Sequence, residues 1–179
     1  MQPAPEGREI AVTPRVALRR LCMADAPFLL RLLNEPSWLQ FIGDKGVHTL
    51  EDARNYLVNG PLAMYARDGF GLYLVERLPD RVPMGMCGLI RRETLPEVDV
   101  GFAFLPEHWG QGYAREAVLA VLDYGQRVFG LRRVIAVTSP GNERSIKLLE
   151  GIGFRFEGLV QMTPGEAEIK MFGRPAPPD

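Results

Sequence analysis

The chain has 179 residues, of which 46% are hydrophobic and 24% charged, a composition typical of a globular protein that can bury a sizeable core. Its 21 Lys and Arg residues against 22 Asp and Glu residues give a formal net charge of -1, which argues against a nucleic-acid partner. No apolar run is long enough to cross a bilayer and residues 1–14 have no apolar stretch typical of a signal peptide, so we expect a cytoplasmic protein without a membrane partner.

The first half of the chain is predicted to contain one strand and two helices. Alternation favours a strand over residues 16–21, and Asp25 with Pro27 suits the start of a helix that runs to Leu33. Thr49 resembles the cap of a second helix, which ends near residue 58. No helix or strand is assigned to residues 36–46. Ahead of the strand, residues 1–13 are expected to form a flexible leader.

Three strands are predicted next, over residues 71–75, 84–90 and 98–105. Period-two alternation in the third strand places four residues on one face and four on the other. Pro106 ends this strand because proline has no N–H for the ladder. The first face carries Val98, Val100, Phe102 and Phe104; the second carries Asp99, Gly101, Ala103 and Leu105.

The remaining pattern predicts a helix over residues 112–129, a strand over 133–138, a helix over 142–149 and strands over 151–154 and 167–172. This order indicates an α+β fold with both parallel and antiparallel pairing. Without an internal linker or repeat, residues 14–174 are expected to form one domain, followed by a flexible tail at residues 175–179.

Cys22 and Cys87 stand apart from each other and from the histidines. Neither a CxxC pair nor a Cys/His cluster is present, so we predict two thiols in a reducing compartment, and neither a disulfide nor a metal site.

The corner between Pro106 and Gly112 has the features of an anion-binding turn. The first N–H groups of a helix lack internal partners and carry partial positive charge, and glycine lets a phosphate approach them. The sequence is neither GxxxxGK[ST] nor GxGxxG, since Arg115 stands where the third glycine would be. A purely structural turn is the alternative.

Two segments, residues 100–117 and 141–154, resemble the cofactor motifs of GNAT N-acetyltransferases, and the form Trp-Gly-Gln-Gly-Tyr-Ala at residues 109–114 is similar to the RimJ/RimL-like branch. The resemblance implies a mixed, centrally splayed β-sheet of about seven strands flanked by helices. It also implies acetyl-CoA as the co-substrate, with an acetyl group passing to an amine by direct attack in a ternary complex.

The resemblance assigns roles to particular residues. Backbone amides of the loop hold the pyrophosphate, while the strand backbone at Phe104 and Leu105 pairs with the pantetheine arm and supplies oxyanion donors. The side-chain amide of Asn142 contacts pantetheine, although a helix N-cap explains this residue equally well. The loop residues are Gly110, Gln111, Gly112, Tyr113 and Ala114.

The sequence departs from the usual catalytic pattern at Leu149, which stands where many GNAT enzymes carry a Tyr that acts as the general acid for the departing thiolate. In the RimJ/RimL-like branch a serine in the place of Ser145 has been proposed as the acid instead; a serine that only bonds local backbone is the alternative. Asp99 is the candidate general base; the alternative is that it is a solvated charge at the entrance of a strand.

The acceptor site is expected at Trp38, Phe41, Ile42 and the turn 161–165, where ordinary packing is the alternative for the aromatic residues. The acceptor is either a small-molecule amine or a protein N-terminal amine, and a homodimer is left open. Two other functions compete with the enzyme: a non-catalytic acyl-CoA-binding module, which Leu149 motivates, and a nucleotide-binding domain that uses the glycine corner.

Overall fold

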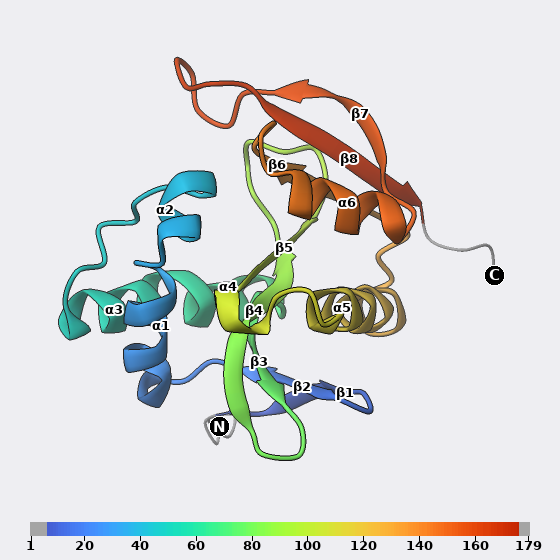
Figure 1. Ribbon diagram of the computed structural model, residues 1–179. Helices are drawn as coiled ribbons and strands as arrows, with labels where there is room; N and C mark the ends of the chain where they lie inside the picture. Colours follow the sequence, from blue (N-terminus) through green and yellow to red (C-terminus); the bar gives the residue numbers. More distant parts are fainter. Residues whose placement is uncertain (1–6, 176–179) are drawn as a thin grey trace.

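A computed structural model describes residues 7–175 of the chain. Within them, eight strands form one sheet in the order β1-β2-β3-β4-β5-β6-β8-β7 (Figure 1). Every neighbouring pair is antiparallel except β5 and β6, which are parallel. The strands are β1 (Glu9–Val12), β2 (Val16–Arg20), β3 (Leu72–Arg77), β4 (Val82–Ile90), β5 (Asp99–Phe104), β6 (Arg133–Thr138), β7 (Arg155–Val160) and β8 (Ile169–Pro175).

Helices cover both faces of the sheet, and Figure 1 shows α1 to α3 on one side and α5 on the other. Buried residues of α1 and α3 pack with Leu74 and Met86, whereas those of α5 pack with Tyr73, Cys87 and Val100. The helices are α1 (Ala26–Leu32), α2 (Pro36–Phe41), α3 (Leu50–Leu57), α4 (Ala63–Asp68), α5 (Tyr113–Phe129) and α6 (Glu143–Gly151). The predicted α+β fold with a mixed sheet is confirmed.

The predicted faces of β5 are also found in the structure. Val98, Val100 and Phe104 are buried in the core on the α5 side, while Leu105 is buried on the α1 and α3 side. This arrangement directs alternate β5 side chains into two separate cores, so β5 lies at the centre of the molecule.

The sheet is splayed between β5 and β6, as expected. Their only registered pair in the described part of the chain is Asp99 with Ile135, next to which the Ile135 amide donates to the Val98 carbonyl (3.0 Å). Beyond this point the two strands separate towards their carboxyl ends. The separation leaves the edge of β5 that faces β6 without a ladder partner.

The amino-terminal strand β1 was not predicted. Within the expected leader of residues 1–13, Glu9–Val12 pairs with β2, and this strand brings the sheet to eight members rather than about seven. A four-residue edge strand has little pattern of its own, because its order comes from the partner strand. Residues 1–6 of the leader and 176–179 of the expected tail lie outside the described residues, and Pro175 ends β8.

Three other segments differ from prediction. Ala63–Asp68 forms the helix α4, beyond the predicted end of the second helix near residue 58. Residues 36–46, to which no element was assigned, contain the short helix α2. The strand expected over 151–154 is instead the end of α6 and its turn, because the Phe154 amide bonds back to the Leu149 carbonyl (3.0 Å), and β7 begins at Arg155.

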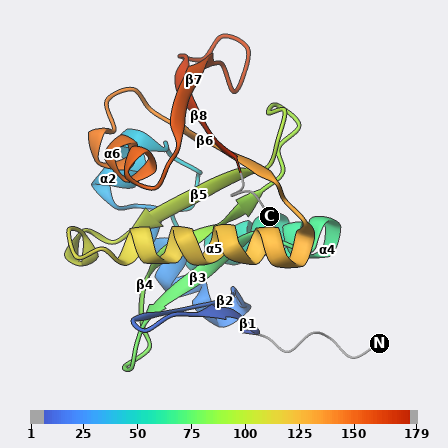
Figure 2. The ribbon, with the colours of Figure 1, turned by 90° about the vertical axis from the view of Figure 1, so that its right-hand side faces the viewer.

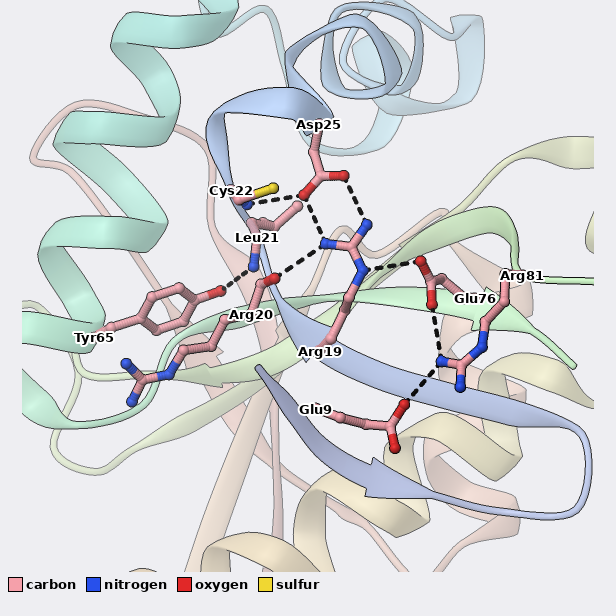
Figure 3. Close-up of polar contacts among 9 residues, drawn as sticks. All are labelled: Glu9, Arg19, Arg20, Leu21, Cys22, Asp25, Tyr65, Glu76 and Arg81. Carbon is pink, nitrogen blue, oxygen red and sulfur yellow. Dashed lines mark hydrogen bonds and ion pairs between the residues drawn. The ribbon is translucent and has the colours of Figure 1, made fainter. Parts of the chain in front are cut away.

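A chain of ion pairs joins the first three strands to the start of α1 (Figure 3). Arg19 on β2 donates from Nη2 to Oδ1 of Asp25 (2.8 Å) and from Nε to Oε1 of Glu76 (2.9 Å). Arg81 continues the chain from Glu76 to Glu9 on β1 (2.8 Å between Nη1 and Oε2 of Glu9). Arg19, Asp25 and Glu76 are largely buried, and burying an unpaired charge would cost free energy. The ion pairs avoid this cost. The network fixes the β1–β2 hairpin against the sheet.

Candidate active site

The glycine corner joins β5 to α5. After one 3-10 turn at Pro106–His108, Gly110 has φ +73° and Gly112 has φ +81°, and α5 begins at Tyr113. Both values lie in the left-handed region that glycine adopts at little cost. No atom lies within 4 Å of the position that a Cβ of Gly110 would take, so the corner is open to solvent there.

The backbone amides from Gly110 to Arg115 have no hydrogen-bond acceptor within residues 7–175. They stand at the N-terminus of a 17-residue helix, where the macrodipole adds partial positive charge. A run of unpaired donors with this charge fits a phosphate or pyrophosphate group. Anion binding at this corner stays a prediction, which these unpaired amides support.

His108 packs into this loop. Its side chain is buried, and its ring lies edge-on to that of Tyr113, 6.4 Å between centroids. Burial, together with the positive charges of Arg77 and Arg31, lowers the pKa of His108.

One edge of β5 faces the splay, and Phe104 rather than Leu105 offers its backbone there. The Leu105 amide donates to the Met84 carbonyl (2.9 Å), and the Leu105 carbonyl accepts from the His108 amide (3.0 Å). Antiparallel pairing alternates, so the N–H and C=O of Phe104 point away from β4 towards β6. The Phe104 carbonyl accepts from Nε1 of Trp109 (2.9 Å), which leaves its N–H for a ligand. Within residues 7–175, the N–H and the C=O of Leu105 are therefore both bonded, and Phe104 is the residue with a free backbone N–H at this edge.

The second motif lies opposite the loop, on α6. Oδ1 of Asn142 accepts from the Ser145 amide (3.2 Å), so the N-cap reading of Asn142 is correct. Its Nδ2 has no partner in the described chain and can still donate to a ligand. The guanidinium of Arg144 lies 4.3 Å from the Trp109 ring centroid, a cation–π contact that joins α6 to the loop after β5.

Ser145 and Leu149 differ in what they can do chemically. The half-buried Ser145 hydroxyl makes no hydrogen bond within residues 7–175, so local backbone does not occupy it. Leu149 is buried in the core beneath α6 and carries no proton to donate. Of the two positions, only Ser145 presents an acidic hydrogen.

Asp99 is a buried carboxyl group and not a solvated charge. It is 1% exposed, and its Oδ1 lies 3.2 Å from Nε of Arg92, a residue that the sequence did not single out. Burial raises the pKa of Asp99 to about 6, although the positive charge of Arg92 acts in the opposite direction. Asp99 stands at the closed end of the splay, five residues or about 17 Å along β5 from Phe104.

The residues expected to bind an acceptor are only partly brought together. Trp38 is buried and its Nε1 donates to the Gly43 carbonyl (3.1 Å), so it serves packing, as its alternative reading held. Ile42 is 44% exposed, and the Phe41 carbonyl accepts from Oγ of Ser139 (2.8 Å), which ties α2 to the end of β6. The turn 161–165 is mostly exposed.

None of the helices within residues 7–175 is long and apolar enough to cross a membrane. Among the same residues, no group of three or more His, Cys, Asp and Glu side chains is arranged to hold a metal ion.

Known proteins resemble this chain in sequence and in fold. The family described as "Acetyltransferase (GNAT) domain" matches residues 15–155. The uncharacterized protein YkkB of Bacillus subtilis is 32% identical over 84% of this chain and 87% of its own length. An acetyltransferase from Agrobacterium tumefaciens has the same fold, with a TM-score of 0.79 and 23% identity over 97% of this chain and 98% of that one. A solved complex of the ribosomal L7/L12 acetyltransferase RimL with coenzyme A gives a TM-score of 0.80 and 20% identity over 94% of this chain and 98% of that one. The chain belongs to the GNAT acetyltransferase family.

Proposed function

We propose that residues 14–174 act as one acetyltransferase domain, which transfers an acetyl group from acetyl-CoA to a primary amine within a ternary complex. The observation that carries the proposal is the run of unpaired amides from Gly110 to Arg115, at a helix N-terminus beside the splay of β5 and β6. A chain of the same fold, RimL, has been solved with coenzyme A.

The loop, β5 and α6 would each hold one part of acetyl-CoA, which supplies the activated acetyl group when bound. The loop amides would donate to its diphosphate, in keeping with their position at the start of α5. The Phe104 N–H and Nδ2 of Asn142 would donate to the pantetheine arm from the two sides of the splay. Holding both reactants together in this way contributes roughly 7 to 11 kcal/mol to lowering the barrier.

Two side chains would move protons. Asp99 would take a proton from the amine through a relay of water molecules, because it is buried about 17 Å along β5 from Phe104, and its pKa of about 6 leaves it ionised at neutral pH. Ser145 would return a proton to the departing thiolate. The thiol resembles that of Cys, with a pKa of about 8.5, so an acid helps the departure without being essential.

We further propose that the chain is cytoplasmic and belongs to the RimJ/RimL-like branch, whose acceptors are protein N-terminal amines; a small amine is the second candidate. The motif at residues 109–114 and the apolar Leu149 support the branch. Two chains of the same fold are described as acetyltransferases of ribosomal proteins: RimL, and the S5-alanine acetyltransferase of Vibrio fischeri.

Thiol release from acetyl-CoA, measured with a panel of peptide N-terminal amines, aminoglycosides and amino acids, tests the proposal. The expected result is release that depends on one amine class. Tight binding of acetyl-CoA without release towards any amine would favour the non-catalytic acyl-CoA-binding module. Displacement by ATP but not by coenzyme A would favour a nucleotide-binding domain.

The pH dependence of kcat/KM tests Asp99. Its carboxyl group must be ionised to accept a proton, so kcat/KM should rise with pH through a midpoint near 6. Asp99→Asn should remove this limb and lower kcat/KM by about 10²- to 10⁴-fold. The profile is measured for both proteins with one amine and saturating acetyl-CoA.

Arg92→Ala distinguishes a base from a structural ion pair. Arg92 lowers the pKa of Asp99, so its removal should move the midpoint to higher pH and leave the plateau rate largely intact. Equal losses in Asp99→Asn and Arg92→Ala, with no shift of the midpoint, would show that the pair only holds β4 and β5 together. Asp123→Asn, an exposed acid on α5, is the control and should leave the profile unchanged.

A further inference from the structure

We propose that Arg15, in the turn between β1 and β2, is a positioning residue that holds the cofactor loop in its binding conformation; this inference rests on the proposed function. Arg15 lies 96 residues before the loop in sequence, yet its Nη1 donates to the Gln111 carbonyl (2.9 Å). The β1–β2 hairpin lies beside α5 (Figure 2), which brings the two segments into contact.

The contact with Gln111 fixes the direction of an amide that would bind the cofactor. A trans peptide is planar, and its C=O and N–H point in opposite directions. Because Arg15 holds the Gln111 carbonyl on the hairpin side of the loop, the Gly112 N–H of the same peptide points away from the hairpin. The Gly112 amide is one of the unpaired donors of the corner.

The guanidinium is itself held by Glu116 and Tyr113, in addition to its bond to Gln111. Its Nε donates to Oε2 of Glu116 (2.7 Å), whose Oε1 accepts from the Arg15 amide (3.1 Å) and from the Thr13 hydroxyl (2.5 Å). Its Cζ lies 4.7 Å from the centroid of the Tyr113 ring. Arg15 therefore contacts the carbonyl before Gly112, the first residue of α5 and the acid one turn later.

Close packing against Gly112 gives this contact a second consequence. A Cβ added at Gly112 would lie 3.1 Å from Nη2 of Arg15, so the guanidinium lies directly beside the left-handed glycine. Lysine has a single charged group and cannot bond Glu116 and Gln111 with one planar fork. The site therefore requires arginine. The carboxylate of Glu116 largely offsets the positive charge of Arg15, which favours a positioning role over direct attraction of the diphosphate.

Comparing acetyl-CoA with a shorter acetyl donor that lacks the diphosphate tests the proposal. If Arg15 positions the loop that binds the diphosphate, its loss should weaken only the reaction of donors that carry a diphosphate. With acetyl-CoA, Arg15→Ala should raise KM for the donor about tenfold, equivalent to about 1.4 kcal/mol, with the amine KM unchanged. With S-acetylpantetheine, which lacks the diphosphate, kcat/KM should equal that of the wild type. Arg15→Lys should behave like Arg15→Ala.

Arg127→Ala is the matched control, because Arg127 forms an ion pair of the same length (2.7 Å) with Asp123 on α5 but lies away from the loop. In this variant, KM for acetyl-CoA and kcat/KM for S-acetylpantetheine should equal those of the wild type. Equal losses with both donors in Arg15→Ala, or no loss with either, would overturn the inference. Should Arg15→Ala not fold, Glu116→Gln replaces it, with the same expected selectivity and the same contradicting results.

Calorimetric titration of the wild type with coenzyme A separates this inference from the proposed function. No binding by the wild type would end the proposed function and the inference together. Binding by the wild type with unchanged affinity in Arg15→Ala would end the inference alone.

Discussion

Replacing Gly112 with valine is expected to abolish coenzyme A binding. Gly112 has φ +81°, a conformation that costs a β-branched residue about 1 to 3 kcal/mol, and the new side chain would meet Arg15. Rotation of the peptide to relieve this strain would turn the loop amides away from the diphosphate, and each charge-assisted bond lost costs about 1.5 to 3 kcal/mol. Loss of two such bonds costs at least about 3 kcal/mol and predicts at least a hundredfold loss of affinity by calorimetry.

Gly130→Val controls for backbone strain. Gly130 caps the other end of α5 with φ +65° and has open space around it, so valine there incurs the same kind of strain without touching the loop. Thermal unfolding should show similar losses of stability for both variants, while only Gly112→Val loses coenzyme A. Unchanged affinity in Gly112→Val would remove the corner from the binding site.

Replacing Ser145 with alanine is expected to lower turnover about 10²-fold while leaving the affinity for acetyl-CoA unchanged. The Ser145 hydroxyl has no hydrogen-bond partner within residues 7–175, and its amide is already capped by Asn142. The substitution therefore removes a proton donor without disturbing the start of α6. Steady-state kinetics give kcat, and calorimetry gives the affinity.

Ser145→Thr supplies the comparison, because it keeps a hydroxyl at the same position. Threonine should retain most of the activity that alanine loses. If Ser145→Ala keeps full turnover, the thiolate departs without a proton from Ser145. If Ser145→Ala and Ser145→Thr lose turnover equally, crowding near α6 explains the loss instead.

The sequence was most informative where local chemistry determines structure. Pro106 marks the end of β5 and Gly112 the start of α5, since each acts through its own backbone constraints. Asn142 caps α6 through its own side chain. Alternation along β5 predicted which residues enter each core, because neighbouring side chains of a strand must point to opposite faces.

Features that depend on distant partners were missed or misjudged. Glu9–Val12 is ordered by β2 and by an ion pair to Arg81, neither of which a four-residue pattern reveals. Arg15 meets Gln111 only once the sheet is assembled. The sequence suggested that the Leu105 backbone could bind the cofactor, but it does not show that the Leu105 amide donates to the Met84 carbonyl.

Asp99 shows a third kind of limit. The sequence shows an acidic residue at the start of β5. Its burial and its pairing with Arg92 follow from how β4 and β5 pack, which the sequence does not show. Both determine its pKa, so the sequence proposes Asp99 as a general base but does not reveal the pKa of its carboxyl group.

The central claim is that the amides from Gly110 to Arg115 receive the diphosphate of coenzyme A. Titration of ¹⁵N-labelled protein with coenzyme A, followed by amide resonances, tests it most directly. Large, saturable shifts of the Gly110, Gln111 and Gly112 amides are expected, with the amides of residues 127–130, at the other end of α5, unmoved. Saturable shifts elsewhere in the chain with these three amides unchanged, or no saturable shift at all, would contradict it.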